Sequence, residues 1–420
     1  MAPGGATGQA GCVLLTDSAA SGIAIFTVRV EEEAASTSAA KWPVSAASEM
    51  IDPTNTPPER ESDILRRTLE ILRSRLPDRW ETAVDEEVRI DTAAQADALV
   101  RLEAPDGSRA ILVLEAKRLV EARDLPRILD QLARTVEGVR SEPGRADRAA
   151  VEPMVVARYL SPRTRQRLED AATSYADATG NLSLSVDQPA LFLRDVGAQR
   201  DPWRRPGRPR ESYRGTPAAR VVRALADFAP PMTVPELAKR SGASAGATYR
   251  MVDLLESDAY IEREERKAIT RVDWRQILER WSQDYEFAGS NPTAAFLQPR
   301  GLKALEATLR EASSRYAISG SIAAECYARY APARLGMVYV DDLDRAAEEL
   351  GLRTVEGGAN VLLAAPKDDF VYERSEAIEG LTYAAPSQVA VDLLTSPGRG
   401  PSEAVVLLDW MEQNEPAWRR

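Results

Sequence analysis

The sequence Ala96-Asp97-Ala98-Leu99-Val100-Arg101-Leu102 turns at Pro105-Asp106-Gly107 and returns as Ala110-Ile111-Leu112-Val113-Leu114-Glu115-Ala116-Lys117. Two apolar runs around a Pro/Asp/Gly cluster predict a pair of antiparallel strands. Folding the chain about residue 106 places Asp97 opposite Glu115, and side-chain alternation puts Glu115 and Lys117 on one face. Opposed residues on one face lie about 5 Å apart at Cβ, so the two carboxylates repel unless a cation lies between them. The hairpin therefore predicts a metal site.

Composition restricts the chemistry of that site. The 420 residues include 0 histidines and 2 cysteines, Cys12 and Cys326. Ser-His-Asp triads, Cys-His pairs and zinc sites built on histidine or on four cysteines are therefore excluded. A metal must be held by oxygen ligands, which favours Mg²⁺ or Mn²⁺. The lack of a disulfide framework predicts a cytoplasmic protein.

Charge and hydropathy limit the class of partner. The net charge of −11 argues against a uniformly basic nucleic-acid coat but permits local basic patches. The chain has no run of about 18 apolar residues, so no membrane span is expected. Residues 1–58 are rich in Ala, Ser, Gly, Thr and Pro, and we expect a disordered tail there. Met50 is an alternative start, because recognisable patterning begins just after it.

Residues 59–199 alternate between helical and extended patterns. The apolar spacing predicts a helix over 60–76 and another over 121–140. Ser161-Pro162 is typical of a helix start, and we expect that helix to run to about residue 176. Extended runs are predicted at 82–90, in the hairpin, and at 151–160, 182–186 and 190–194.

This order, with Asp on the second strand and Glu-x-Lys on the third, resembles the PD-(D/E)XK nuclease superfamily, whose fold is a restriction-endonuclease-like α/β domain. Asp97 matches the family aspartate, and Glu115-Ala116-Lys117 matches its (D/E)-x-K motif. Gln131 lies on the following helix, where several branches of the family carry a motif glutamine. The resemblance implies phosphodiester hydrolysis, with Asp97, Glu115, Lys117 and Gln131 as site residues.

The chemistry of phosphodiester hydrolysis explains why these residue types matter. A Mg²⁺ held by Asp97, Glu115 and the Ala116 carbonyl polarises the phosphate and acidifies a bound water. Lys117 then orients that water and stabilises the developing charge, and Gln131 positions a phosphate or the water. Glu70, on the first helix, is a further candidate metal ligand. Two alternatives remain: an inactive scaffold of this fold, which needs no metal, and a simple surface ion pair on an ordinary hairpin.

An arginine-rich linker follows at 200–215. Its segment Pro206-Gly207-Arg208-Pro209-Arg210 resembles an AT-hook core, although no arginine stands immediately before Gly207. An arginine arm of this kind reads a narrow, A·T-rich minor groove. A solvated basic linker that only attracts phosphate is the alternative. The candidate DNA-binding residues are Arg204, Arg205, Arg208 and Arg210.

Residues 216–275 have the pattern of a winged helix-turn-helix. An amphipathic helix at 217–226 precedes a short helix capped by Thr233, a turn at Ser241-Gly242-Ala243, and a helix capped by Ser244. A two-stranded wing is expected over 260–272. The whole resembles the DNA-binding domain of IclR-type regulators, which implies a third helix in the major groove. Candidate contacts are Ser244, Thr248, Tyr249 and Arg250 on that helix, and Arg263 and Lys267 on the wing.

Residues 276–314 are expected to form a helical connector, and 315–420 a C-terminal α+β domain. Gly320-Ser321, Gly358-Ala359-Asn360, and Ala385-Pro386-Ser387-Gln388 with the following Asp392-Leu393-Leu394 resemble AbiEi-type antitoxins of type IV toxin–antitoxin systems. That resemblance implies a repressor with a toxin or other protein partner bound through the C-terminal domain, and a homodimer is a further expectation.

Two functional hypotheses follow for this α/β multidomain chain, and both require double-stranded DNA. In the first, the winged helix delivers a Mg²⁺- or Mn²⁺-dependent nuclease to duplex DNA. In the second, the chain is a transcriptional regulator or antitoxin-like repressor that uses no metal.

Overall fold

The computed structural model describes residues 57–89, 95–142, 149–203, 213–264 and 268–420. The expected tail at 1–58 lies almost wholly outside these ranges. The described residues form a mixed α/β protein with three sheets. None of the helices in the described ranges combines the length and apolarity needed to cross a bilayer.

Residues 57–203 form a seven-stranded sheet in which the strands lie in sequence order, β1 to β7. The pairs β3–β4 and β4–β5 are parallel and the other pairs are antiparallel, so the carboxyl ends of β3, β4 and β5 share one edge. The strands are β1 (Glu81–Arg89), β2 (Gln95–Glu103), β3 (Arg109–Lys117), β4 (Ala150–Ala157), β5 (Ser174–Asp177), β6 (Leu182–Val186) and β7 (Leu191–Asp195).

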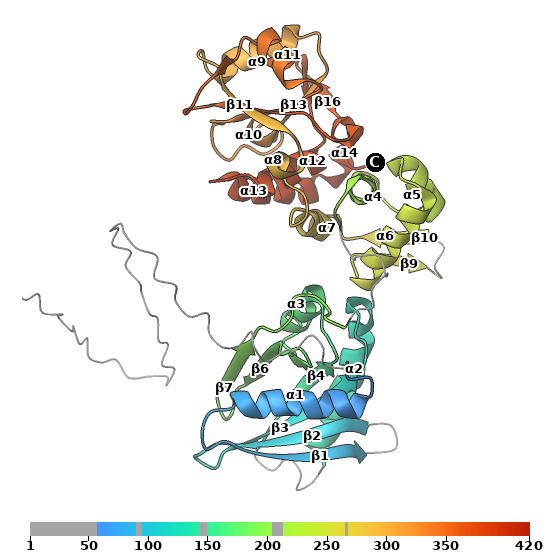
Figure 1. Cartoon of the computed structure of the whole chain (residues 1–420). Helices are drawn as coiled ribbons and strands as arrows, with labels where there is room; N and C mark the ends of the chain where they lie inside the picture. Colours follow the sequence, from blue (N-terminus) through green and yellow to red (C-terminus); the bar gives the residue numbers. More distant parts are fainter. Residues whose placement is uncertain (1–56, 90–94, 143–148, 204–212, 265–267) are drawn as a thin grey trace, which may run out of the picture. The chain divides into compact units, whose positions relative to one another are not determined.

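Helices cover both faces of this sheet, which explains why β3 is apolar on both sides (Figure 1). Leu112 and Leu114 pack with α1 (Glu61–Arg75), whereas Ile111 and Val113 pack with α2 (Leu125–Ser141). The alternation of the strand thus divides the domain into two cores. The remaining helical elements are η2 (Ala122–Asp124) and α3 (Pro162–Asp170).

The helix predicted from residue 162 to residue 176 is too long. Ser161 caps it as expected, accepting a hydrogen bond from the Thr164 N–H, but α3 ends at Asp170. Ala172 then takes the left-handed conformation with φ 48°, which no continuing helix allows. The next residues form β5, a fully buried strand between β4 and β6. Non-local pairing therefore overrides the local helical pattern.

Residues 213–420 share one continuous hydrophobic core. Its first part is a winged helix with the three-stranded sheet order β8-β10-β9. The elements are α4 (Thr216–Asp227), β8 (Met232–Thr233), α5 (Val234–Ser241), α6 (Ala245–Ser257), β9 (Ile261–Glu264) and β10 (Ala268–Val272).

The C-terminal part is built on a seven-stranded mixed sheet with the order β14-β11-β15-β13-β12-β17-β16. The strands are β11 (Thr293–Leu297), β12 (Tyr316–Ser319), β13 (Gly336–Val340), β14 (Arg353–Thr354), β15 (Val361–Ala364), β16 (Glu376–Ile378) and β17 (Leu381–Tyr383). The helices are α7 (Trp274–Trp281), α8 (Phe287–Ser290), α9 (Leu302–Glu311), α10 (Gly320–Ala324), α11 (Leu343–Glu349), η3 (Asp369–Tyr372), α12 (Pro386–Leu394), α13 (Gly400–Gln413) and α14 (Glu415–Trp418).

The expected helical connector at 276–314 is wrong in one respect. It contains the strand β11, which pairs with β15 from Thr293↔Ala364 to Phe296↔Val361. The C-terminal sheet therefore recruits residues from before position 315, and the boundary predicted there cuts through the domain.

Candidate active site and nucleic-acid interface

The β2–β3 hairpin has the predicted register. Its pairs run from Glu103↔Arg109 to Ala98↔Leu114, so the fold axis lies at residue 106 as expected. One step further, the Asp97 carboxylate accepts a hydrogen bond from the Ala116 N–H at 2.7 Å. Asp97 is thereby fixed beside the end of β3.

Lys117 lies between the two predicted carboxylates. Its Nζ is 2.7 Å from Glu115 Oε1 and 3.6 Å from Asp97 Oδ2. The same Nζ donates to the Ala116 carbonyl at 3.2 Å. Three oxygens from Asp97, Glu115 and Ala116 thus surround one cationic group at the carboxyl end of β3.

Burial sets the electrostatics of this cluster. Glu115 is 2% exposed, and this burial raises the pKa of its carboxyl against the opposing effect of Lys117. Burial lowers the pKa of Lys117, but the hydrogen bond to Glu115 and the charge of Asp97 outweigh it, so the pKa is raised. Lys117 is therefore a firmly protonated ammonium that neutralises a buried carboxylate.

Gln131 joins the cluster from α2. Its Nε2 donates to Glu115 Oε1 at 3.0 Å, which fixes the carboxylate from the side opposite the strand. The sequence placed Gln131 on the helix after β3, and the structure brings all four residues of the predicted site together.

Glu70 lies elsewhere. Its side chain is 61% exposed and pairs with Arg66 on its own helix, so the proposal of Glu70 as a metal ligand is not supported by its contacts. Glu61, in the first turn of α1, instead contributes to the electrostatics of both Glu115 and Lys117. No local pattern indicates Glu61, because its closeness to Glu115 and Lys117 depends on how α1 packs against the sheet.

Among the described residues, the carboxylates in contact with Lys117 Nζ are those of Asp97 and Glu115. Over the ranges that the structure describes, no three acidic or cysteine side chains are grouped closely enough to hold a metal. A cation here would therefore be held by Asp97, Glu115 and the Ala116 carbonyl, and water would complete the coordination. This all-oxygen set suits Mg²⁺ or Mn²⁺.

The helix-turn-helix begins with a capping box. The Thr233 hydroxyl accepts from the Glu236 N–H, and the Glu236 carboxylate accepts from the Thr233 N–H at 2.7 Å. The turn requires Gly242, which has φ 63°. Ser244 then caps α6 by accepting from the Ala247 N–H. Sequence chemistry alone thus fixes both ends of the turn.

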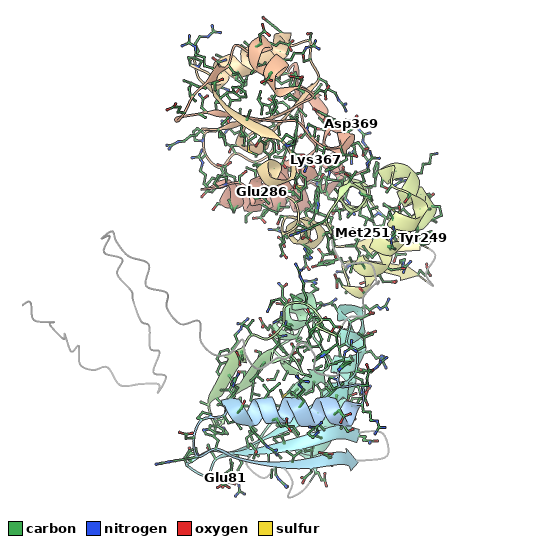
Figure 2. All side chains as sticks on the ribbon, viewed as in Figure 1. Glu81, Tyr249, Met251, Glu286, Lys367 and Asp369 are labelled. Atoms are coloured by element: carbon green, nitrogen blue, oxygen red, sulfur yellow. The ribbon has the colours of Figure 1, made fainter. Side chains whose placement is uncertain are left out.

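The outer face of α6 carries a tyrosine and an arginine. Tyr249 is 47% exposed and Arg250 is exposed, whereas Met251 points into the core (Figure 2). These two side chains and the exposed Ser244 are available to a groove. In a helix-turn-helix, the second helix lies in the major groove of DNA with its exposed side toward the bases.

Two predicted DNA contacts are contradicted by burial. Thr248 is 0% exposed, and its hydroxyl donates to the Ser244 carbonyl at 3.0 Å. The Arg263 side chain is 6% exposed and is held by Asp253 and Glu256 of α6. Both residues stabilise the domain and are not available for phosphate or base contact. The predicted contacts Arg204, Arg205, Arg208, Arg210 and Lys267 lie outside the described residues.

Comparison with protein families agrees with this geometry. The IclR helix-turn-helix domain matches residues 218–265. Residues 218–265 form an IclR-type helix-turn-helix domain. The match extends from α4 into the wing, and it supports DNA binding and transcription regulation. No curated protein and no solved structure matches the chain significantly.

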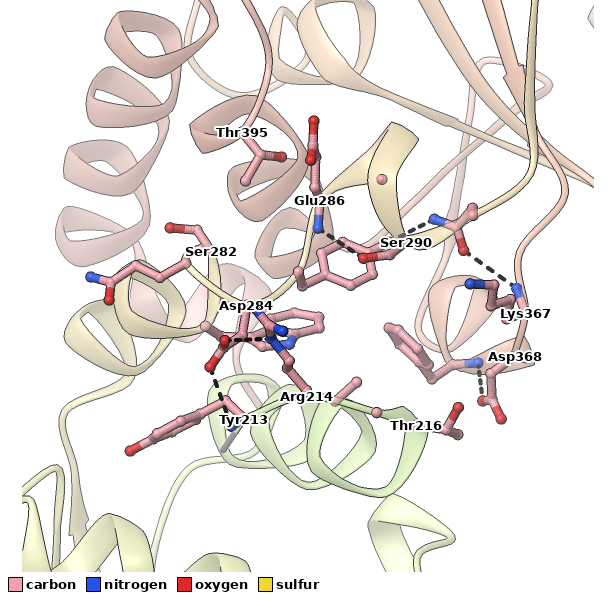
Figure 3. A pocket seen from close by; sticks show the side chains of 18 of the residues that line it. Tyr213, Arg214, Thr216, Ser282, Asp284, Glu286, Ser290, Lys367, Asp368 and Thr395 are labelled. Atoms are coloured by element: carbon pink, nitrogen blue, oxygen red, sulfur yellow. Dashed lines mark hydrogen bonds and ion pairs between the residues drawn. The ribbon is translucent and has the colours of Figure 1, made fainter. Parts of the chain in front are cut away.

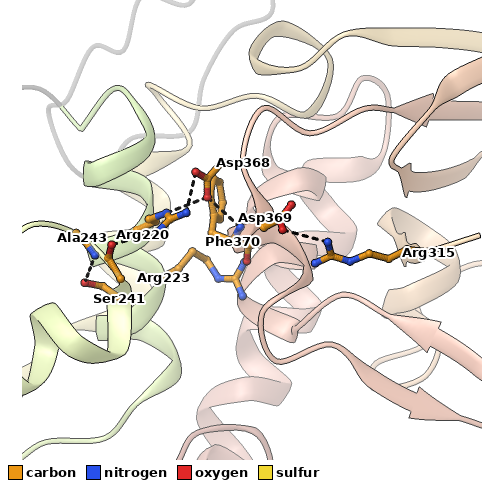
Figure 4. A network of polar contacts seen from close by, with 9 residues as sticks. Arg220, Arg223, Ser241, Ala243, Arg315, Asp368, Asp369 and Phe370 are labelled. Atoms are coloured by element: carbon orange, nitrogen blue, oxygen red, sulfur yellow. Dashed lines mark hydrogen bonds and ion pairs between the residues drawn. The ribbon is translucent and has the colours of Figure 1, made fainter.

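Helix α4 of the IclR-type domain is fixed to the C-terminal domain by buried polar contacts. Arg223 is 1% exposed; it donates to Gln388 Oε1 at 2.7 Å and pairs with Asp227 at 3.0 Å. Ser387 donates to the same Asp227. At the surface, Arg220 binds Asp368 with two bonds of 2.9 and 3.0 Å (Figure 4).

The buried contacts continue to Asp392 on α12. Its carboxylate accepts from Ser319 at 2.5 Å, from Tyr339 at 2.8 Å and from Gln388 at 2.9 Å. Burial raises the pKa of Asp392 to about 7, against the opposing effect of these hydrogen bonds. Helix α12 and the strands beside it thus supply polar residues that hold the IclR-type domain in place. No pattern in the sequence indicates this role.

A hollow of about 690 Å³ lies beside this junction (Figure 3). The start of α4 contributes Thr216 and Ala219, the α7–α8 segment contributes Asp284 and Glu286, and Lys367 comes from the loop before η3. Asp284 forms ion pairs with Arg214 at 2.9 Å and with Arg280 at 3.1 Å. The negative charge of Asp284 on this wall is therefore neutralised by arginines of the protein itself.

Proposed function

We propose that this protein binds duplex DNA through its IclR-type domain and hydrolyses phosphodiester bonds at the Asp97–Glu115–Lys117 site with Mg²⁺ or Mn²⁺. The observation that carries the hydrolytic part is the convergence of two carboxylates and a backbone carbonyl on Lys117 Nζ. Gln131 is the fourth member, because it orients Glu115.

Each residue of the site has a separate proposed role. Asp97 and Glu115 would hold the cation, which when bound polarises the phosphate and acidifies a water. Gln131 keeps Glu115 in its orientation through the 3.0 Å hydrogen bond. Lys117 would supply positive charge beside the scissile phosphate.

The IclR-type domain supplies affinity and register on DNA. Arg250 and Tyr249 on α6 are the proposed groove contacts, with Ser244 at the helix start. Lys239, exposed in the last turn of α5, is an additional proposed phosphate contact, since the helix preceding the recognition helix crosses the backbone.

A cleavage assay tests the hydrolytic proposal. Supercoiled and linear DNA are incubated with the protein and Mg²⁺ or Mn²⁺, beside Asp97→Ala and Lys117→Ala. We expect nicking or cutting by the native protein and none by either variant. Absence of cleavage under all conditions, or equal cleavage by the variants, removes the enzyme proposal.

The second candidate is a repressor that does not cut, with the C-terminal domain receiving a toxin or another protein partner. It is favoured by Lys117, whose ammonium lies within ion-pair distance of both carboxylates and reduces their repulsion without a metal. In this case the N-terminal domain only binds DNA or a partner. A reporter driven by the protein's own promoter, repressed equally by the native protein and by Asp97→Ala, supports this candidate. Light scattering of the protein on its operator tests the proposed homodimer.

A further inference from the structure

Two arginines at the carboxyl edge of the N-terminal sheet converge on one carboxylate. Arg118 Nη1 lies 2.8 Å from Glu59 Oε2, and Arg158 Nη1 lies 3.7 Å from Glu59 Oε1. Arg118 follows β3 and Arg158 follows β4, and the parallel pair Lys117↔Ala157 precedes them. They therefore occupy adjacent positions directly beyond the paired ends of the strands.

This arginine pair lies next to the proposed hydrolytic site. Arg118 is the residue after Lys117, and successive side chains of a strand point to opposite faces. The arginines thus lie around the edge of the sheet from Asp97, Glu115 and Lys117. A polyanion that crosses this edge would meet both groups in succession.

Arg158 is already oriented before any ligand arrives. It is 17% exposed, and Asp201 holds its Nη2 at 2.9 Å. The Arg118 side chain is more accessible, at 59% exposed. Arg118 makes a charge-assisted hydrogen bond to Glu59, and Arg158 makes a longer ion pair with the same carboxylate. Phosphate has the oxygen geometry to replace a carboxylate between two guanidinium groups.

We propose that Arg118 and Arg158 form a seat for a DNA backbone phosphate beside the scissile bond, and that Glu59 occupies this seat in the DNA-free protein. This inference rests on the proposed function, since it assumes that this edge of the sheet faces DNA. The recognised group is a phosphodiester of duplex DNA, without base specificity. Glu59 competes with that phosphate and so restrains binding.

The chain offers a matched control pair. Arg109 and Glu103 form the same kind of ion pair at 2.9 Å, at the opposite end of β3, where Arg109 is 65% exposed. Glu59→Gln and Arg118→Ala are therefore compared with Glu103→Gln and Arg109→Ala in the full-length protein. The measurement is affinity for a duplex in EDTA, which prevents cleavage, at several salt concentrations.

If the seat exists, substitution of Glu59 and substitution of Arg118 should have opposite effects on DNA affinity. Glu59→Gln should raise affinity several-fold, whereas Arg118→Ala should lower it. The slope of log affinity against log salt should become less negative by about 0.9 for Arg118→Ala, because one phosphate contact is lost. Glu103→Gln and Arg109→Ala should leave affinity and slope near the native values.

Equal behaviour of Arg118→Ala and Arg109→Ala, together with no gain for Glu59→Gln, overturns the seat. Arg158→Lys, which keeps the charge, checks the role of the fixed guanidinium and should also lower affinity. The result is separable from the fate of the nuclease proposal. If the salt slopes change as expected but no DNA is cleaved, the phosphate seat is supported and the nuclease proposal is contradicted. If DNA is cleaved but the slopes do not change, the nuclease proposal is supported and the seat is contradicted.

Discussion

Lys117 Nζ lies 2.7 Å from Glu115 Oε1, and the Glu115 side chain is almost fully buried. A buried carboxylate without a cationic partner is strongly destabilising. Lys117 therefore stabilises the fold in addition to its proposed role in hydrolysis. The contribution to stability can be measured separately through its dependence on pH.

Lys117→Met should lower the free energy of unfolding by about 1–3 kcal/mol at pH 8 in EDTA, less than for a fully enclosed pair because Lys117 is partly exposed. The pKa of Glu115 is raised in the folded state, so the folded protein binds that proton more tightly than the unfolded chain. Stability from this group is therefore lost as pH rises, and the penalty of Lys117→Met should shrink at pH 5. Urea denaturation at both pH values measures it.

Lys303→Met is the control for that prediction. Lys303 pairs with Glu306 at 3.1 Å but is 88% exposed, so its loss should change stability little at either pH. A penalty for Lys117→Met that is the same at pH 5 and pH 8 would contradict the account of Glu115.

Arg250→Ala should weaken specific DNA binding by about 1–3 kcal/mol if Arg250 reads a base edge. Arg263→Ala should instead lower stability, because Arg263 is buried against Asp253 and Glu256. Gel shifts at physiological salt and thermal denaturation of both variants separate the roles. Unchanged affinity for Arg250→Ala, or a larger affinity loss for Arg263→Ala in folded protein, contradicts the assignment.

Asp392→Asn should flatten the dependence of stability on pH. Burial raises the pKa of Asp392 to about 7, whereas the unfolded carboxyl titrates near its ordinary value of 3.8. Between these values the folded state holds a proton that the unfolded state has released, so native stability falls as pH rises toward 7. Asparagine stays neutral, so between pH 5 and pH 8 the stability of the variant should rise relative to that of the native protein.

The control is Asp369→Asn, since Asp369 is 72% exposed and pairs with Arg315 at the surface. Its pH–stability curve should run parallel to that of the native protein. If the curve of Asp392→Asn is also parallel, Asp392 does not carry a raised pKa.

The hairpin register and the helix caps could be predicted from sequence because they depend on local chemistry. Period-two alternation and one turn determine where Asp97 lies relative to Glu115. Ser161, Thr233 and Ser244 cap the helices at which they were expected. These features need no knowledge of distant residues.

The errors arose where distant residues decide the outcome. The end of α3 depends on the pairing of β5 between β4 and β6. The availability of Thr248 and Arg263 depends on which face of α6 packs against the rest of the domain. The role of Gln388 depends on Arg223, far away in the sequence, and no spacing pattern reveals that contact.

In the proposed function, Asp97 takes part in cutting DNA that the protein has already bound. Asp97→Asn keeps the size of the side chain and removes its charge, so it should bind a duplex at least as tightly as the native protein. The most direct measurement is the rate at which each protein nicks supercoiled DNA with Mg²⁺, at concentrations that give equal occupancy. We expect nicking by the native protein and none by Asp97→Asn; equal rates, or no nicking by either, would contradict a hydrolytic role for Asp97.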